Sequence, residues 1–212
     1  EDRFDDFILE RKKLISEKLG HLFIKSNKND FSINLSDEIS EVDIKSSLEE
    51  LIAKGESDEL EFKSSLKWCL KENRADKKLE VIIMKSIAAF SNGHGGTLLI
   101  GVNDNGEVIG LKNDFSILGN NRDGFELHLR ELIKKNFKET FATNNIKITF
   151  CTIQNSEVCA LQIKRGYEPV YVEVQDKTGN KTNKLYVRSG NSSIEIPIEE
   201  VSKFLSSRFT IK

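Results

Sequence analysis

Four carboxylates crowd into the stretch GESDELEFK, residues 55–63, where Glu56, Asp58, Glu59 and Glu61 precede a phenylalanine and a lysine. Carboxylates that converge near a phosphodiester can hold Mg²⁺ or Mn²⁺, because these ions prefer oxygen ligands, and the ion can generate hydroxide for hydrolysis. Acidic runs are also common as solvated surface charge. The spacing within the stretch therefore decides which acids can act together.

Glu56 and Glu61 are five positions apart. Residues at that spacing face opposite sides of a strand, and on a helix they diverge by about 140°. The two carboxylates can converge only if a turn lies between them, and Ser57 and Asp58 are suitable turn residues. We therefore predict that Glu56 lies in a loop, that Glu61 lies on a strand, and that Asp58 and Glu59 are solvated.

Upstream of this stretch, the sequence predicts an N-terminal helical segment over residues 1–54. Apolar residues recur at helical spacing over residues 2–23, a polar linker covers 25–37, and a second helix runs from about residue 40 or 43 to Lys54, where Gly55 ends it. The first residue is Glu1 rather than Met, which suggests a fragment or a processed chain. The segment would be the tail of an upstream domain, a dimerisation arm or a lid.

The main domain is predicted to cover residues 55–212. Its fold class is α+β, a mixed and mostly antiparallel sheet with helices packed on one face. We predict its elements as a strand at LEFKSS, an irregular lysine-rich segment at LKWCLKENRADKK, a helix over 77–90, a hairpin of TLLIGV and EVIGL around NDNG, a helix over 122–138, a hairpin of 146–154 and 157–164, strands at PVYVEV and KLYVRSG, and a helix after Pro197.

The glycine-rich stretch SNGHGG lies between the predicted helix 77–90 and the strand TLLIGV. Phosphate-binding glycine loops need the reverse order, with a strand before the loop and a helix after it. We therefore interpret the glycines as a helix stop with close backbone packing, and His94 as a loop residue.

Composition excludes several classes of protein. The chain has 212 residues, a net charge of −2, and no apolar run of the ~18 residues that a membrane span needs, so we expect a soluble, cytoplasmic protein. Residues 1–54 hold 9 basic and 13 acidic residues, and the remainder holds 23 and 21. A nucleic acid would therefore have to bind a local stripe of basic residues, because the protein as a whole has no positive electrostatic field to attract it.

The three cysteines, Cys69, Cys151 and Cys159, contain no CxxC pair and predict free thiols. If Asn155 and Ser156 form the turn of the second hairpin, Thr152 pairs with Cys159. The sulfurs of Cys151 and Cys159 then point to opposite faces and cannot bond.

Four segments in this order resemble the Schlafen AlbA-type domain over about residues 55–207: ESDELEFKSS, IAAFSNGHGGTLLIGVNDNGEVIGL, PVYVEV and KLYVRSGNSS. In vertebrate Schlafens that cleave tRNA and rRNA, this domain looks like a divalent-metal-dependent endoribonuclease with three acids. The resemblance places them at Glu56, Glu61 and Asp104, as metal ligands and catalytic residues for Mg²⁺ or Mn²⁺. By sequence alone Asp104 is a turn residue.

The resemblance and the basic residues also suggest a nucleic-acid contact surface. Arg188 matches a recurrent family position and would contact a phosphate or pair with a carboxylate, and Trp68 and Tyr186 are candidates for base stacking or for the core. The predicted nucleic-acid-binding residues are Lys63, Lys67, Lys71, Arg74, Lys77, Lys78, Lys164, Arg165, Lys184 and Arg188.

Two functions follow, with a third less favoured. The first is a metal-dependent endoribonuclease that acts on structured RNA such as tRNA, in stress or anti-phage defence. The second is a non-catalytic RNA- or DNA-binding regulatory module of a larger protein, and the third is ATP binding, which the order of elements around the glycines disfavours. The vertebrate enzymes build a clamp from two tandem lobes whereas this chain has one, so we predict a homodimer or association with another domain of a full-length protein.

Overall fold

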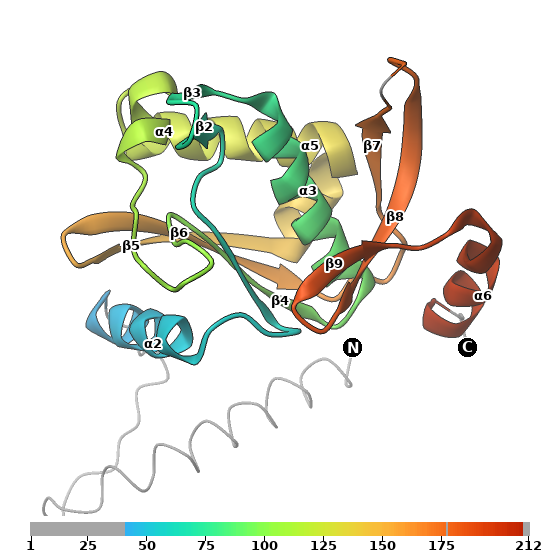
Figure 1. The fold of residues 1–212 in the computed structure, drawn as a ribbon. Helices are drawn as coiled ribbons and strands as arrows, with labels where there is room; N and C mark the ends of the chain where they lie inside the picture. Colours follow the sequence, from blue (N-terminus) through green and yellow to red (C-terminus); the bar gives the residue numbers. More distant parts are fainter. Residues whose placement is uncertain (1–40, 177, 210–212) are drawn as a thin grey trace, which may run out of the picture. The chain divides into compact units, whose positions relative to one another are not determined.

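The computed structural model describes residues 41–176 and 178–209. The helix predicted over 2–23 and the linker over 25–37 lie outside these residues. At the centre is a four-stranded sheet with the order β1-β4-β6-β5 (Figure 1). Its strands are β1 (Leu60–Lys63), β4 (Gly95–Ile100), β5 (Ile146–Ile153) and β6 (Ser156–Lys164). β1 is parallel to β4, and the other two pairs are antiparallel, which confirms the predicted mixed, mostly antiparallel α+β class.

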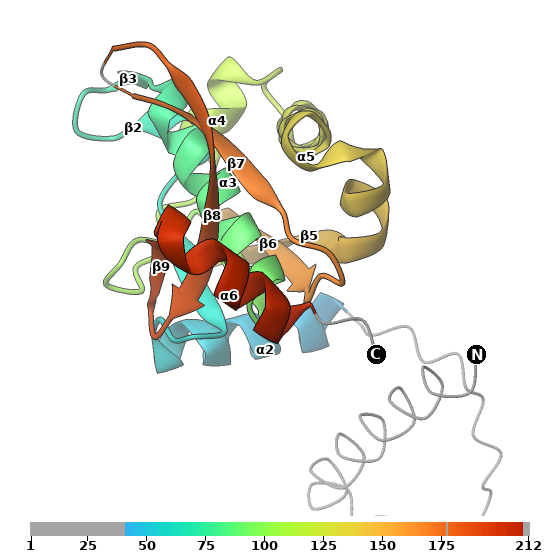
Figure 2. The same ribbon diagram turned by 90° about the vertical axis from the view of Figure 1, so that its right-hand side faces the viewer.

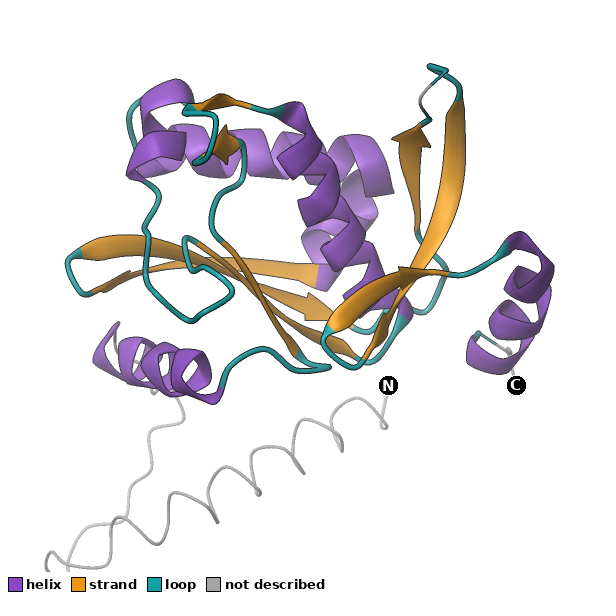
Figure 3. Ribbon diagram, viewed as in Figure 1, coloured by secondary structure: helices purple, strands orange, loops and turns teal. Residues whose placement is uncertain are grey.

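Helices cover this sheet because apolar side chains alternate along its strands. On one face α3 (Lys77–Asn92) and α5 (Arg122–Asn145) enclose a core that includes Leu98, Leu161 and Phe125. On the other face α2 (Glu41–Lys54) places Leu48 against Phe62 and the neighbouring strands. The same arrangement can be followed by element type in Figure 3. Gly55, with a φ of 77°, ends α2 as predicted.

A second, three-stranded antiparallel sheet packs beside α3, with β8 lying along that helix (Figure 2). It consists of β7 (Tyr171–Gln175), β8 (Lys181–Ser189) and β9 (Ser192–Glu195), and α6 (Ile198–Arg208) follows it. The remaining elements are the short ribbon of β2 (Trp68–Cys69) and β3 (Arg74–Ala75), and the helix α4 (Lys112–Ile117). Within the described residues no helix is long and apolar enough to cross a membrane.

The hairpin predicted for TLLIGV and EVIGL forms only beside its turn. Val102 and Val108 form an isolated antiparallel bridge, the N–H of Asn103 donates to the carbonyl of Glu107, and the N–H groups of Ile109 and Gly110 donate to the carbonyl of Gly101. The pairing extends no further along β4, because β4 is already paired with β1 on one side and β6 on the other. Gly101 and Gly110, with φ values of 101° and 77°, end this short pairing.

The second hairpin forms as predicted, but its turn is Gln154–Asn155 instead of Asn155–Ser156. Both turn residues have positive φ, 51° and 60°, which matches the twist of a two-residue hairpin. Cys159 therefore pairs with Phe150 rather than Thr152. Cys151 and Cys159 still lie in the cores on opposite faces of the sheet and are not joined by a disulfide. Burial raises the pKa of Cys159 well above its usual value.

The glycine stretch acts as a helix stop and a packing point, as the order of elements predicted. The N–H of Gly93 donates to the carbonyls of Ala89 and Phe90 at the end of α3. A Cβ at Gly96, where φ is 157°, would lie 2.4 Å from ring atoms of Phe90. Only glycine lets β4 approach α3 this closely.

Candidate functional site

A tight turn brings Glu56 back onto the strand that carries Glu61. The N–H of Ser57 donates to the carbonyl of Leu60 at 2.9 Å, and a Glu56 Oε1 accepts from the N–H of Phe62 at 2.8 Å. Glu56 thus lies in a loop and Glu61 on β1, as the spacing predicted. Asp58 and Glu59, also in this turn, are exposed.

Glu61 lies in a nearly buried charge cluster rather than in solvent. Its Oε1 is 2.6 Å from the Nζ of Lys63, and its Oε2 pairs with Nη1 of Arg188 on β8. The side chains of Arg188 and Glu61 are only 4% and 8% exposed. Arg188 also donates through Nη2 to the carbonyl of Ser57, and its guanidinium lies over the ring of Phe90, 4.8 Å from the centroid. Of the two roles weighed for Arg188, the structure shows the ion pair.

Asp104, the third predicted ligand, lies exposed in the turn that follows β4. Asn103 shapes this turn by accepting from the N–H groups of Asn105 and Glu107. No group of three or more His, Cys, Asp or Glu side chains in the described ranges is placed to hold a metal ion. As arranged, the residues do not fit Mg²⁺ or Mn²⁺, because both oxygens of Glu61 already face cations. The metal-binding and catalytic roles of the three acids stay predictions.

The ten predicted nucleic-acid-binding residues fall into two classes. Half of them are in ion pairs with carboxylates: Lys63 and Arg188 with Glu61, Lys67 with Glu80, Arg74 with Glu72, and Lys184 with Glu195. The other half are exposed and make no ion pair with another described residue: Lys71, Lys77, Lys78, Lys164 and Arg165. Only the residues of this second class can contact a phosphate without first breaking an ion pair with a carboxylate.

The five exposed cations lie in two places. Lys71 is in the turn between β2 and β3, and Lys77 and Lys78 begin α3. Lys164 ends β6 and Arg165 follows it directly. We name these the α3 group (Lys71, Lys77, Lys78) and the β6 group (Lys164, Arg165).

Two buried polar residues whose side chains join distant segments were missed by the sequence analysis. Asn92 donates through Nδ2 to the carbonyls of Val170 and Tyr186, and its Oδ1 accepts from the N–H of Val170. Glu80 accepts from Lys67 at 3.0 Å, and its Oε1 is 2.8 Å from Nε2 of His128. The position of Asn92 in SNGHGG, between a helix and a glycine, is the one feature of the sequence that could have indicated its role. Nothing local distinguishes Glu80 from its neighbours.

Tyr186 belongs to the core rather than to a stacking surface, since it is 4% exposed and its carbonyl is held by Asn92. Trp68 is partly buried, and its indole Nε1 is buried as well. Neither ring therefore has a fully exposed face on which a base could stack. Tyr167, by contrast, has 89% of its surface accessible. Exposed aromatics, which the sequence analysis did not single out, are therefore the better candidates for base stacking.

The buried phenol of Tyr186 predicts a loss of stability at high pH. Burial, assisted by the negative charge of Glu195, raises its pKa from 10.0 to about 12. Because the folded state holds this proton more tightly than the unfolded state, the contribution is fully present below pH 10 and is lost as the pH rises toward 12. In urea titrations from pH 9 to 12, the wild type should lose stability relative to Tyr186→Phe. Parallel pH curves for the two proteins would contradict this.

Comparison with known proteins gives a family match and a fold match. The family model described as Schlafen, AlbA_2 matches residues 56–197. The crystal structure of the DIP2311 protein from Corynebacterium diphtheriae is similar at a TM-score of 0.50 and 16% identity, over 78% of this chain and 32% of its own. The solution structure of the N-terminal domain of a RecG-related protein from Nitrosomonas europaea matches at 18% identity and a TM-score of 0.38, over 73% of this chain and 93% of its own. The chain thus spans about a third of the DIP2311 protein, and that likeness shows the fold alone.

Proposed function

Since this chain belongs to the Schlafen AlbA_2 family, whose membership points to nucleic-acid binding, we propose that it holds RNA or DNA chiefly through the phosphate backbone, as a binding module. The observation that carries the proposal is the separation of its cations. The α3 and β6 groups are exposed and make no ion pair with another described residue, whereas Arg188 and Lys63 neutralise Glu61. The module then needs no metal to bind.

Backbone binding of this kind has a measurable electrostatic signature. Each lysine or arginine that neutralises a phosphate releases a condensed counterion, so the logarithm of the association constant falls with the logarithm of salt by about 0.9 per contact on a DNA duplex and about 0.7 on a single strand. Five free cations permit a moderate salt dependence even though the net charge of the protein is −2. The local arrangement of charge, rather than its sum, supports binding.

We expect Lys164→Ala/Arg165→Ala to weaken binding and to reduce the magnitude of the salt slope by about 2, because each side chain supplies about one contact. The triple alanine variant of the α3 group should reduce it by about 3. Fluorescence anisotropy with labelled tRNA, a 20-nucleotide single strand and a DNA duplex, between about 50 and 200 mM salt, measures the slope.

A matched control removes cations that are already paired. Lys45 is in an ion pair with Glu49, and Lys181 with Glu173, so Lys45→Ala/Lys181→Ala should leave the slope within about 0.5 of the wild type. Absence of wild-type binding to all three probes at the lowest salt would overturn the proposed function. Equal slopes for all variants would show that the named cations do not contact phosphates.

The metal-dependent endoribonuclease predicted from the sequence, acting on structured RNA such as tRNA in stress or anti-phage defence, is the second candidate. It is favoured by one observation, the turn that brings Glu56 onto the strand of Glu61. Incubation of tRNA with Mg²⁺ or Mn²⁺, with and without EDTA, tests it beside Glu56→Ala, Glu61→Gln and Asp104→Ala. Cleavage that needs metal and is lost in these variants would make the endoribonuclease the first candidate. Undiminished cleavage by a variant with all three substitutions would exclude the three acids as catalytic residues.

The predicted homodimer, or association with another domain of a longer protein, is a separate part of the proposal. One lobe with two separated groups of cations offers a smaller contact surface than two lobes would. Light scattering of the chain alone and with tRNA measures the assembly state. A monomer in both conditions would leave association with another domain as the remaining form.

A further inference from the structure

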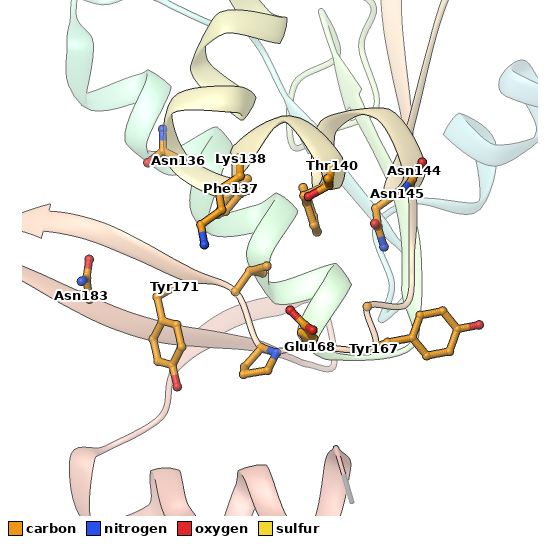
Figure 4. Close-up of a pocket in the computed structure, with 14 residues that line it drawn as sticks. Asn136, Phe137, Lys138, Thr140, Asn144, Asn145, Tyr167, Glu168, Tyr171 and Asn183 are labelled. Carbon is orange, nitrogen blue, oxygen red and sulfur yellow. The ribbon is translucent and has the colours of Figure 1, made fainter. Parts of the chain in front are cut away.

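A pocket of about 470 Å³ lies apart from the Glu61–Arg188 pair, between the second half of α5 and the segment 166–171 (Figure 4). We call this segment the strap. Asn183 of β8 also lines the pocket. Its volume falls within the range of about 300 to 1,000 Å³ typical of small-molecule sites.

The strap is held in place by α3, so this wall of the pocket is formed before any ligand binds. The N–H of Gly166 donates to the carbonyl of Ser91 at 2.8 Å. At the other end, Asn92 both donates to the carbonyl of Val170 and accepts from its N–H. Arg208 of α6 adds a hydrogen bond to the carbonyl of Gly166. A preformed wall reduces the ordering cost of binding.

The facing wall contains the one break in α5. Lys138, which lines the pocket, has a φ of 71° and a ψ of 166° inside the helix. This conformation is nearly exclusive to glycine and costs a lysine about 1 to 3 kcal/mol. Strained backbone of this kind concentrates at ligand sites. The part of α5 that follows Lys138 carries Asn144 and Asn145, which also line the pocket (Figure 4).

The lining is rich in uncommitted amides. The side chains of Asn144, Asn145 and Asn183 make no hydrogen bond to another residue of the described ranges. An amide offers a donor and an acceptor together, which matches the paired donor and acceptor on the edge of a nucleobase. Glu168 also faces the pocket in Figure 4. The negative charge of Glu168 disfavours a phosphate group inside the pocket. Its carboxylate oxygens can accept a hydrogen bond from the exocyclic amine of a base.

Aromatic and basic residues border the same pocket. Tyr167 is 89% exposed and points away from the pocket in Figure 4, and Tyr171 is 36% exposed. Each can stack a base next to the one inside, at about 1 to 3 kcal/mol per base. Lys164 and Arg165 are exposed and immediately precede the strap, and Lys138 lines the opposite wall, so cations are available on both sides for the phosphates of a strand.

We propose that this pocket binds an unpaired nucleobase of a single-stranded RNA or DNA segment, with adjacent bases stacked on Tyr167 and Tyr171. The inference rests on the proposed function and makes it more specific, because a base inside the pocket cannot remain in a duplex. The β6 group then contacts the phosphates beside the pocket, and the α3 group serves both single and double strands.

The test compares a 12-nucleotide single strand with a blunt 20-base-pair duplex of the same backbone. Asn144→Ala/Asn145→Ala and, separately, Tyr167→Ala should weaken binding of the single strand by about tenfold. Their affinity for the duplex should stay within about twofold. Tyr167 is too exposed for its loss to unfold the domain, so this variant remains informative even if the asparagine variant folds poorly.

Asn105→Ala/Asn113→Ala, two exposed asparagines outside the pocket, is the matched control and should bind like the wild type. Competition with adenosine monophosphate and with cytidine monophosphate tells a free nucleotide from a strand: displacement of the 12-mer only by other strands supports the proposal. Unchanged single-strand affinity in both pocket variants would overturn it, as would an equal loss on both probes or full displacement by either mononucleotide. A wild type that binds neither probe would overturn the proposed function instead.

Discussion

Asp114→Ala is expected to lower the free energy of unfolding by about 3 to 5 kcal/mol. Asp114 lies in α4, is 1% exposed, and accepts four hydrogen bonds. Its Oδ2 accepts from Ser65 Oγ and the N–H of Leu66, and its Oδ1 accepts from the N–H groups of Lys67 and Trp68. Alanine would leave several buried donors without an acceptor, and each costs about 1 to 3 kcal/mol when the chain does not relax.

The loop that Asp114 holds contains the only tryptophan of the chain, so unfolding in urea can be followed by its fluorescence. Asp104→Ala is the matched control, since Asp104 is exposed in a turn and should change stability by about 0.5 kcal/mol or less. Asp114→Asn keeps the shape but replaces one acceptor with a donor, and should fall between the two. If Asp114→Ala were as stable as the control, other contacts would have to hold the loop.

This prediction also bears on the proposed interface. The loop held by Asp114 carries Lys67 and leads directly into the β2–β3 ribbon with Lys71. A loosened loop should therefore weaken nucleic-acid binding through the α3 group while it leaves the β6 group in place. The loss of affinity should be larger for the duplex than for the 12-nucleotide single strand, because the single strand also uses the pocket.

The elements of the main domain were largely predictable because their signals are local. Leu79, Ile83 and Ile87 recur at helical spacing and are largely buried in α3, and Gly55 marks the end of α2. The loop position of Glu56 and the strand position of Glu61 were also predictable, because Ser57 and Asp58 between them are turn residues. Strand pairing is not local, and the hairpin expected between TLLIGV and EVIGL stopped beside its turn because two distant strands, β1 and β6, occupy both edges of β4.

The partners of the buried charges could not be predicted from the sequence. Arg188 is 127 residues from Glu61, and Asp114 is 46 to 49 residues from its donors. The residues that neighbour Arg188 and Asp114 in the sequence do not indicate which distant group either side chain contacts. A phosphate contact and an ion pair were therefore equally open for Arg188. The pocket was beyond reach for the same reason, since α5, the strap and β8 meet only in the fold.

Arg188→Ala is expected to destabilise the domain by about 3 to 5 kcal/mol, the cost of breaking a buried ion pair by removing one partner. The loss would leave Glu61, which is 6% exposed, with Lys63 as its remaining cation. It would also remove the contact over Phe90 and the hydrogen bond to the carbonyl of Ser57, which shapes the turn of Glu56. Arg188→Lys should recover only part of the stability, because an ammonium cannot reach two acceptors in the fixed geometry of a guanidinium.

A double-mutant cycle separates the pair from its surroundings. Glu61→Gln, Arg188→Met and the double variant, compared by urea unfolding, should give a coupling energy above about 1.5 kcal/mol, because both groups are desolvated. The matched control is the partly exposed pair of Arg130 and Glu126, with side chains 42% and 31% accessible, which should couple by less than about 1 kcal/mol. A coupling for Glu61 and Arg188 as small as that of the control would mean that Arg188 is free to leave the carboxylate. Glu61 could then take up the metal ligation that its present partners oppose, and the endoribonuclease would become the stronger candidate.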